Sequence, residues 1–175
     1  MQKTLKHTHI IGFIFTIAIG SLLHFIFEWS GSNPFVASFA PVNESTWEHL
    51  KLLFFPVFIY LLFEFAYIGR NYKNYFMAMF IGILAGMAAI VVLFYTYSGI
   101  IGQNCFVMDI LIFFIGDLVT SLLSYKLILS QKKIIPNPWI GLILILVLVL
   151  IFVTFTYNPP HIPLFLDPVS QIFGI

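Results

Sequence analysis

Five long apolar segments divide the chain, and they constrain its fold more than any other feature. They cover residues 10–27, 52–68, 75–95, 105–127 and 139–157. A helix needs about 20 mostly apolar residues to cross a bilayer, and a helix satisfies all of its own backbone hydrogen bonds in hydrocarbon. The pattern therefore predicts an all-α bundle of five transmembrane helices that occupies residues 1–175 as one domain.

The composition excludes other classes of protein. The chain is 61% hydrophobic and only 9% charged, whereas soluble domains carry about 25% charged residues. A net charge of +1 provides no basic surface for nucleic acid, and the single cysteine, Cys105, cannot form an internal disulfide. The expected partner is the lipid bilayer, and assembly into a homo-oligomer or a larger membrane complex stays open.

The positive charges predict how the chain is oriented in its membrane. In a five-span arrangement, seven of the eight Lys and Arg residues fall on one side, and Lys51 is the exception. The seven are Lys3, Lys6, Arg70, Lys73, Lys126, Lys132 and Lys133. Cytoplasmic loops of membrane proteins carry an excess of Lys and Arg, so we expect the N-terminus in the cytoplasm and the C-terminus outside.

Histidine and acidic residues gather on the opposite, outer side. His24 and Glu28 lie one helical turn apart, as do Glu44 and Glu48. Imidazole and carboxylate groups are ligands of divalent metal ions. The candidate ligands for a metal ion or a small solute are His24, Glu28, Glu44, Glu48, His49 and His161.

Purely structural roles are open for the same residues. Ser45 and Glu48 have the spacing of a capping box, which predicts that a helix begins there. His24 follows Gly12, Thr16 and Gly20 at four-residue intervals, a pattern typical of close helix packing. A divalent metal ion is thus the candidate cofactor, beside the alternative that the site holds none.

A second polar set lies within the apolar segments. It consists of Glu64, Asp109, Asp117 and Ser121. Ionisable groups at such depths are costly and mark functional positions. We therefore predict a polar path inside the bundle, with a packing face of bonded hydroxyl groups as the alternative.

Two outer motifs resemble those of a known family. The motifs are the stretch Asn43–Lys51, of the form NES-x-WEHLK, and the stretch Pro159–Pro168, of the form PPH-x-PLF-x-DP. They resemble a family of small bacterial integral membrane proteins of unknown function. The resemblance implies a multi-pass protein of the bacterial cytoplasmic membrane, and it implies no activity.

Three functions remain open from the sequence. The first is capture of a divalent cation or small solute at the outer site for uptake. The second is a membrane-embedded metal-dependent hydrolase that acts on lipid-linked substrates, although no HExxH motif is present. The third is a structural or regulatory membrane protein without a ligand, so enzymatic activity stays undecided.

Overall fold

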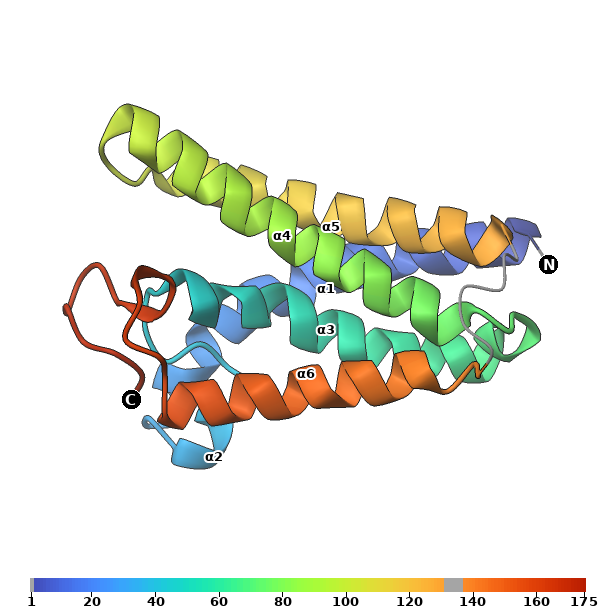
Figure 1. The fold of residues 1–175 in the computed structure, drawn as a ribbon, viewed down its shortest axis with the longest axis horizontal. Helices are drawn as coiled ribbons and strands as arrows, with labels where there is room; N and C mark the ends of the chain where they lie inside the picture. The colour runs from blue at the N-terminus through green and yellow to red at the C-terminus, as the bar shows by residue number, and fades with distance from the viewer. Residues whose placement is uncertain (1, 131–136) are drawn as a thin grey trace.

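The five predicted spanning helices are present in the computed structural model, which describes residues 2–130 and 137–175 (Figure 1). The helices of the bundle are α1 (Gln2–Trp29), α3 (Thr46–Tyr67), α4 (Tyr75–Ile101), α5 (Phe106–Ser130) and α6 (Ile140–Tyr157). The short helix α2 (Pro34–Ala37) lies between α1 and α3, and single 3-10 turns cover Gly69–Asn71 and Pro163–Phe165. Each long helix is apolar enough to cross a membrane, so the predicted all-α class is confirmed.

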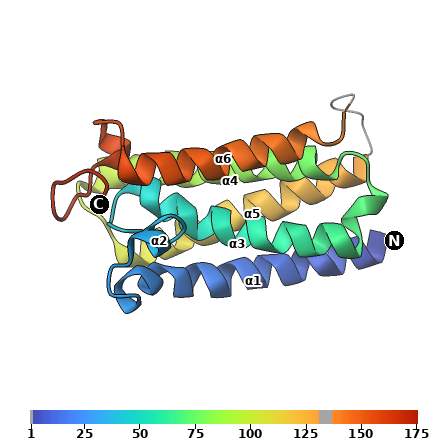
Figure 2. The same ribbon diagram turned by 90° about the horizontal axis from the view of Figure 1, so that it is seen from below.

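The helices run alternately up and down, which places the connections at two ends of the bundle. The N-terminus and the α3–α4 connection lie at one end, and the α1–α3 loop, the α4–α5 turn and the C-terminal tail lie at the other (Figures 1 and 2). We call these the N-terminal end and the tail end. Lys3, Lys6, Arg70 and Lys73 fall at the N-terminal end, while Lys132 and Lys133 lie outside the described residues.

Several helices extend beyond the predicted apolar segments. Helix α1 begins at Gln2 instead of residue 10, so Lys3, Lys6 and two histidines are helical. Helix α4 continues to Ile101, and Gly102 ends it in a left-handed conformation with φ 79°. Hydropathy marks only the apolar part of a helix, whereas the backbone hydrogen bonds continue until a residue such as this glycine stops them.

Helices α1 and α3 approach closely at two glycines of α1. A Cβ atom on Gly12 would lie 2.6 Å from the ring of Tyr60, and one on Gly20 would lie 2.5 Å from the carbonyl oxygen of Leu52. That carbonyl has no helical N–H partner, because the residue four positions on is Pro56. The predicted packing of the Gly12–Thr16–Gly20 series is therefore present, and Gly20 is needed for the close approach.

Helices α4 and α5 form the most extensive contact of the bundle. A Cβ atom on Gly82 would lie 2.8 Å from the carbonyl oxygen of Thr120, and one on Gly86 would lie 2.5 Å from the carbonyl oxygen of Gly116. These backbone atoms cannot move away cheaply. Small residues at this interface thus set the distance between the two helices.

We predict that Gly86→Ala destabilises the folded protein by about 1–3 kcal/mol, because the added methyl group overpacks the α4–α5 contact. Gly99→Ala is the matched control, because Gly99 lies in the same helix and nothing lies within 4 Å of its added Cβ atom. Thermal unfolding in detergent measures both variants. Equal melting temperatures for the two variants would contradict the assignment.

Candidate functional site

Three of the predicted ligands come together at the tail end of the bundle. His24 projects from α1, His49 from the first turns of α3, and Glu44 from the loop just before α3. One ligand atom from each residue lies within 4.8 Å of the other two. His24 Nε2 lies 3.9 Å from Glu44 Oε1, and His49 Nε2 lies 3.3 Å from Glu44 Oε2. The three side chains are 31–49% exposed, so solutes can reach them.

The orientation of the His49 ring is fixed by a backbone contact at the ring nitrogen that does not face Glu44. Its Nδ1 atom lies 3.0 Å from the carbonyl oxygen of Ser45, the residue that caps α3. A proton on Nδ1 is donated to that carbonyl, so Nε2 is the atom that faces Glu44. The hydrogen bond with His49 also lowers the pKa of the Glu44 carboxyl group, which keeps it ionised at neutral pH.

A cavity of about 300 Å³ lies beside this cluster, between α3, α4, α5 and the tail. Glu44, His49 and Asp109 supply its charged side chains. Tyr97 donates a hydrogen bond to Asp109 and so fixes its carboxylate. The remaining walls are mostly apolar, and Pro168 and Val169 of the tail form part of them. We call this space the outer cavity.

Glu48 is directed away from the cluster and is already fully bonded. Its carboxylate lies 2.6 Å from Lys51 Nζ and accepts hydrogen bonds from the Val42 N–H and the Thr156 hydroxyl group. Lys51 Nζ also donates to the carbonyl oxygens of Ala37 and Ala40. This buried pair ties the α1–α3 loop and α6 to α3, which is the structural role of Lys51, the one Lys or Arg at the tail end among the described residues.

The predicted capping box is half present. The Ser45 hydroxyl group accepts from the Glu48 N–H at 3.3 Å, as expected for a helix that begins at Thr46. The reciprocal bond is absent among the described residues, because Glu48 pairs with Lys51 and the side chain of Asn43 accepts from the Ser45 N–H instead.

The other outer residues lie apart from the cluster. Glu28 is exposed on the last turn of α1. His161 is exposed and stacks on Phe173 within the tail. Asp167 accepts from the Val169 N–H and the Ser170 hydroxyl group, so it stabilises a turn of the tail.

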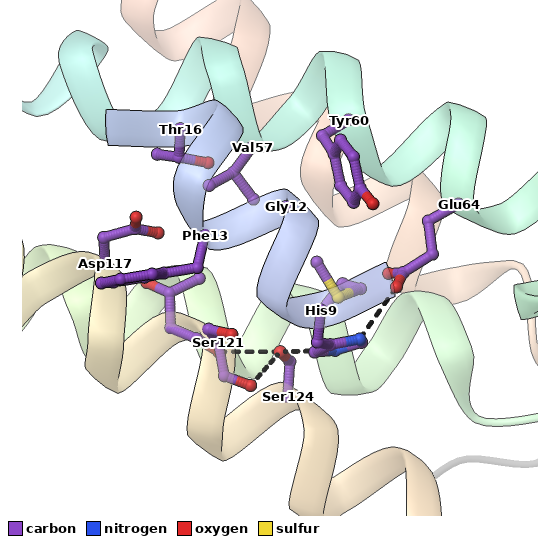
Figure 3. Close-up of a pocket in the computed structure, with 12 residues that line it drawn as sticks. His9, Gly12, Phe13, Thr16, Val57, Tyr60, Glu64, Asp117, Ser121 and Ser124 are labelled. Carbon is purple, nitrogen blue, oxygen red and sulfur yellow. Dashed lines mark hydrogen bonds and ion pairs between the residues drawn. The ribbon is translucent and has the colours of Figure 1, made fainter. Parts of the chain in front are cut away.

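The residues of the predicted polar path divide between two cavities. Asp109 lines the outer cavity, whereas Glu64, Asp117 and Ser121 line a second cavity of about 30 Å³ between α1, α3, α4 and α5. We call this second space the inner cavity (Figure 3). Among the described residues none lines both cavities, and the apolar walls of the outer cavity include Leu52, Ile90 and Phe113.

His9, which was not among the predicted site residues, also lines the inner cavity. It forms a close pair with Glu64, and the hydroxyl groups of Thr8 and Tyr75 lie within hydrogen-bond distance of the same carboxylate. A signal was available in the sequence, because Thr8 precedes Gly12, Thr16 and Gly20 by the same four-residue step. The first predicted apolar segment starts at residue 10, so Thr8 and His9 fall outside it.

Five helices that are long and apolar enough to cross a membrane, with polar clusters toward both ends of the bundle, are the features of a polytopic α-helical membrane protein. The chain belongs to a family of unknown function, DUF6512, whose model matches residues 1–175. No curated protein and no solved structure matches the chain. The geometry of the polar clusters is therefore the basis for a functional assignment.

We predict that Lys51→Met lowers the stability of the folded protein by about 3–5 kcal/mol, because it leaves the buried Glu48 carboxylate unpaired. The double variant Glu48→Gln/Lys51→Met removes both charges and regains much of that loss. Lys6→Met, at an exposed lysine, serves as the control. Thermal unfolding in detergent gives the comparison, and a double variant less stable than Lys51→Met would refute the pairing argument.

Proposed function

We propose that this protein binds a divalent transition-metal ion at the extracytoplasmic end of its bundle, as the capture step of uptake. The ligands are His24, Glu44 and His49, and the membrane is the bacterial cytoplasmic membrane. The observation that carries the proposal is the convergence of three ligand atoms from three segments within 4.8 Å.

The ligand types and spacings suit an ion such as Zn²⁺. Two imidazole nitrogens and a carboxylate oxygen are a common ligand set for zinc, which leaves a fourth position for water or solute. With metal–ligand bonds of about 2.1 Å, tetrahedral ligands lie about 3.4 Å from one another. Glu44 lies 3.3 Å from His49 and 3.9 Å from His24, so small side-chain rotations complete the site.

The surroundings support coordination by His49. The bond from its Nδ1 atom to the Ser45 carbonyl oxygen is the outer-shell contact that commonly orients a metal-binding imidazole. The metal ion then takes the position of the proton between His49 Nε2 and the Glu44 carboxylate. Because all three side chains are partly exposed, the ion can enter from solution without opening the bundle.

Charge supports the proposed orientation. Lys3, Lys6, Arg70 and Lys73 lie at the N-terminal end, while the tail end holds one lysine that is neutralised by Glu48. The positive-inside rule then assigns the N-terminal end to the cytoplasm and the metal cluster to the outside. No described residue lines both the outer and the inner cavity, which supports capture of an ion in this conformation and not its passage through the bundle.

We expect purified protein to bind one Zn²⁺ ion per chain in isothermal titration calorimetry. His24→Ala and His49→Ala should each weaken binding at least about 10-fold, since loss of an outer-shell partner alone costs about 10–100-fold. His161→Ala is the matched control, because it removes an exposed histidine at the same end of the bundle. Wild-type affinity in the His24 and His49 variants, or equal losses in all three, would overturn the proposal.

A second function is favoured by the outer cavity. Its mostly apolar walls, with the Asp109 carboxylate beside the proposed metal site, suit a metal-dependent hydrolase that binds the apolar part of a lipid-linked substrate. In that case Asp109→Asn abolishes hydrolysis but leaves zinc binding intact. In a capture protein the same variant leaves metal-dependent uptake intact.

A further inference from the structure

His9 of α1 and Glu64 of α3 form a buried pair at the inner cavity, on the N-terminal side of the bundle. Their side chains are 6% and 1% exposed, and His9 Nδ1 lies 2.8 Å from Glu64 Oε1. The Thr8 hydroxyl group lies 2.5 Å from Oε1 and 3.0 Å from the Leu5 carbonyl oxygen. The Tyr75 hydroxyl group lies 2.9 Å from Oε2 and 3.0 Å from the Leu61 carbonyl oxygen. Figure 3 shows the pair beside the inner cavity.

The contacts of the two His9 nitrogens restrict where its protons can lie. The Ser124 hydroxyl group has a single proton and three acceptors within reach, the backbone carbonyl of Thr120 at 2.7 Å, that of Ser121 at 3.1 Å and His9 Nε2 at 3.3 Å. When that proton goes to the nearer Thr120 carbonyl, the Ser124 oxygen is free to accept from a hydrogen on His9 Nε2. Nδ1 then lies 2.8 Å from Glu64 Oε1 in a geometry that forms no hydrogen bond, and a proton held by either atom relieves the contact between two acceptors.

The surroundings contain no fixed positive charge that could replace this proton. The described residues that line the inner cavity include neither Lys nor Arg. The other titratable groups that face the pair are the phenols of Tyr60, Tyr75 and Tyr125, the carboxyl group of Asp117 across the inner cavity, and the imidazole of His7 on the side of the N-terminal end. An ionised carboxylate at this depth is costly, and a shared proton makes the pair neutral overall.

A second opening leads from the pair toward the N-terminal end. A cavity of about 430 Å³ lies between α1 and α3 and is lined by Thr4, His7 and Tyr67, among others. Glu64 lines both this cavity and the inner cavity. Protons from the N-terminal side can therefore reach Glu64 without crossing the apolar layer.

Asp117 lies across the inner cavity from the pair, on α5. It is 1% exposed, and its Oδ2 atom has no hydrogen-bond partner among the described residues. A cavity of about 30 Å³ exceeds the roughly 10–15 Å³ that a water molecule requires. The hydroxyl groups of Ser121 and Ser124 line the interval between Asp117 and His9, so a water molecule there has polar partners.

We propose that His9 and Glu64 are a proton-binding pair that is loaded from the N-terminal end of the bundle and passes protons to Asp117. In this transfer Glu64 gives its proton to His9 Nδ1, and His9 Nε2 releases its own proton through the inner cavity to Asp117 Oδ2. One N–H bond forms as another breaks, and the carboxyl O–H bond moves from Glu64 to Asp117. This site is separate from the metal cluster and does not depend on it.

Nitrogen NMR of ¹⁵N-histidine-labelled protein in bilayers, with a chelator present, tests the shared proton. Comparison with His9→Gln assigns the resonances of His9. We expect Nε2 to carry a hydrogen and Nδ1 to show the shift of a protonated or proton-sharing nitrogen. In Glu64→Gln the Nδ1 resonance should move to that of a bare acceptor, whereas Glu28→Gln, the matched control at the exposed end of α1, should leave it unchanged.

Infrared spectra test whether Asp117 holds a proton, which is the end state of the transfer. Asp117→Asn should lose one carbonyl band of a protonated carboxylic acid that shifts in deuterated water, and Asp167→Asn should keep it. A wild-type His9 with a bare Nε2 atom, or a Glu64→Gln variant with unchanged His9 resonances, would overturn the proton-binding pair. Retention of the carboxylic acid band in Asp117→Asn would overturn Asp117 as the group that receives the proton. Neither result depends on metal binding, so the two proposals can fail separately.

Discussion

The cost of an ionisable side chain in the membrane interior is the constraint on which the rest of this structure depends. A charge that loses its water must find a partner, bind a proton or remain near the surface. The chain uses all three solutions. Lys51 and Glu48 are partners for each other and are bonded to four further groups. Glu64 is paired with His9, with which we propose that it shares a proton. The side chains of His24, Glu44 and His49 remain partly exposed at the tail end.

These solutions differ in what they leave available for chemistry. Both members of the Lys51–Glu48 pair have their hydrogen-bonding capacity used by loop and helix groups, so the pair holds the α1–α3 loop in place. Glu44 lies in that loop, and its position near the two histidines depends on the loop. The fully bonded pair is therefore a structural support, whereas the histidines beside it keep ring nitrogens free for a ligand.

The fold was predictable from the sequence because hydropathy alone identifies spanning helices. The five segments, the start of α3 near Ser45 and the close packing of α1 all followed from local patterns. The direction of the Glu48 side chain did not follow from local patterns, because Lys51 and Thr156 bind its carboxylate in place of the predicted ligand cluster. The extension of α1 through Thr8 and His9 was also missed, since polar residues at the end of a span lower its hydropathy.

The register between α1 and α3 explains why both clusters form. His9 and His24 are fifteen residues apart on α1, and His49 and Glu64 are fifteen residues apart on α3. Because these helices are antiparallel, the register that brings His24 beside His49 also brings His9 beside Glu64. Fifteen residues complete slightly more than four turns, about 22 Å along the axis, so both pairs lie on nearly the same helix face. Gly12 and Gly20 permit the close approach between the two pairs, and a sliding of α1 along α3 would therefore alter the metal cluster and the buried proton pair together.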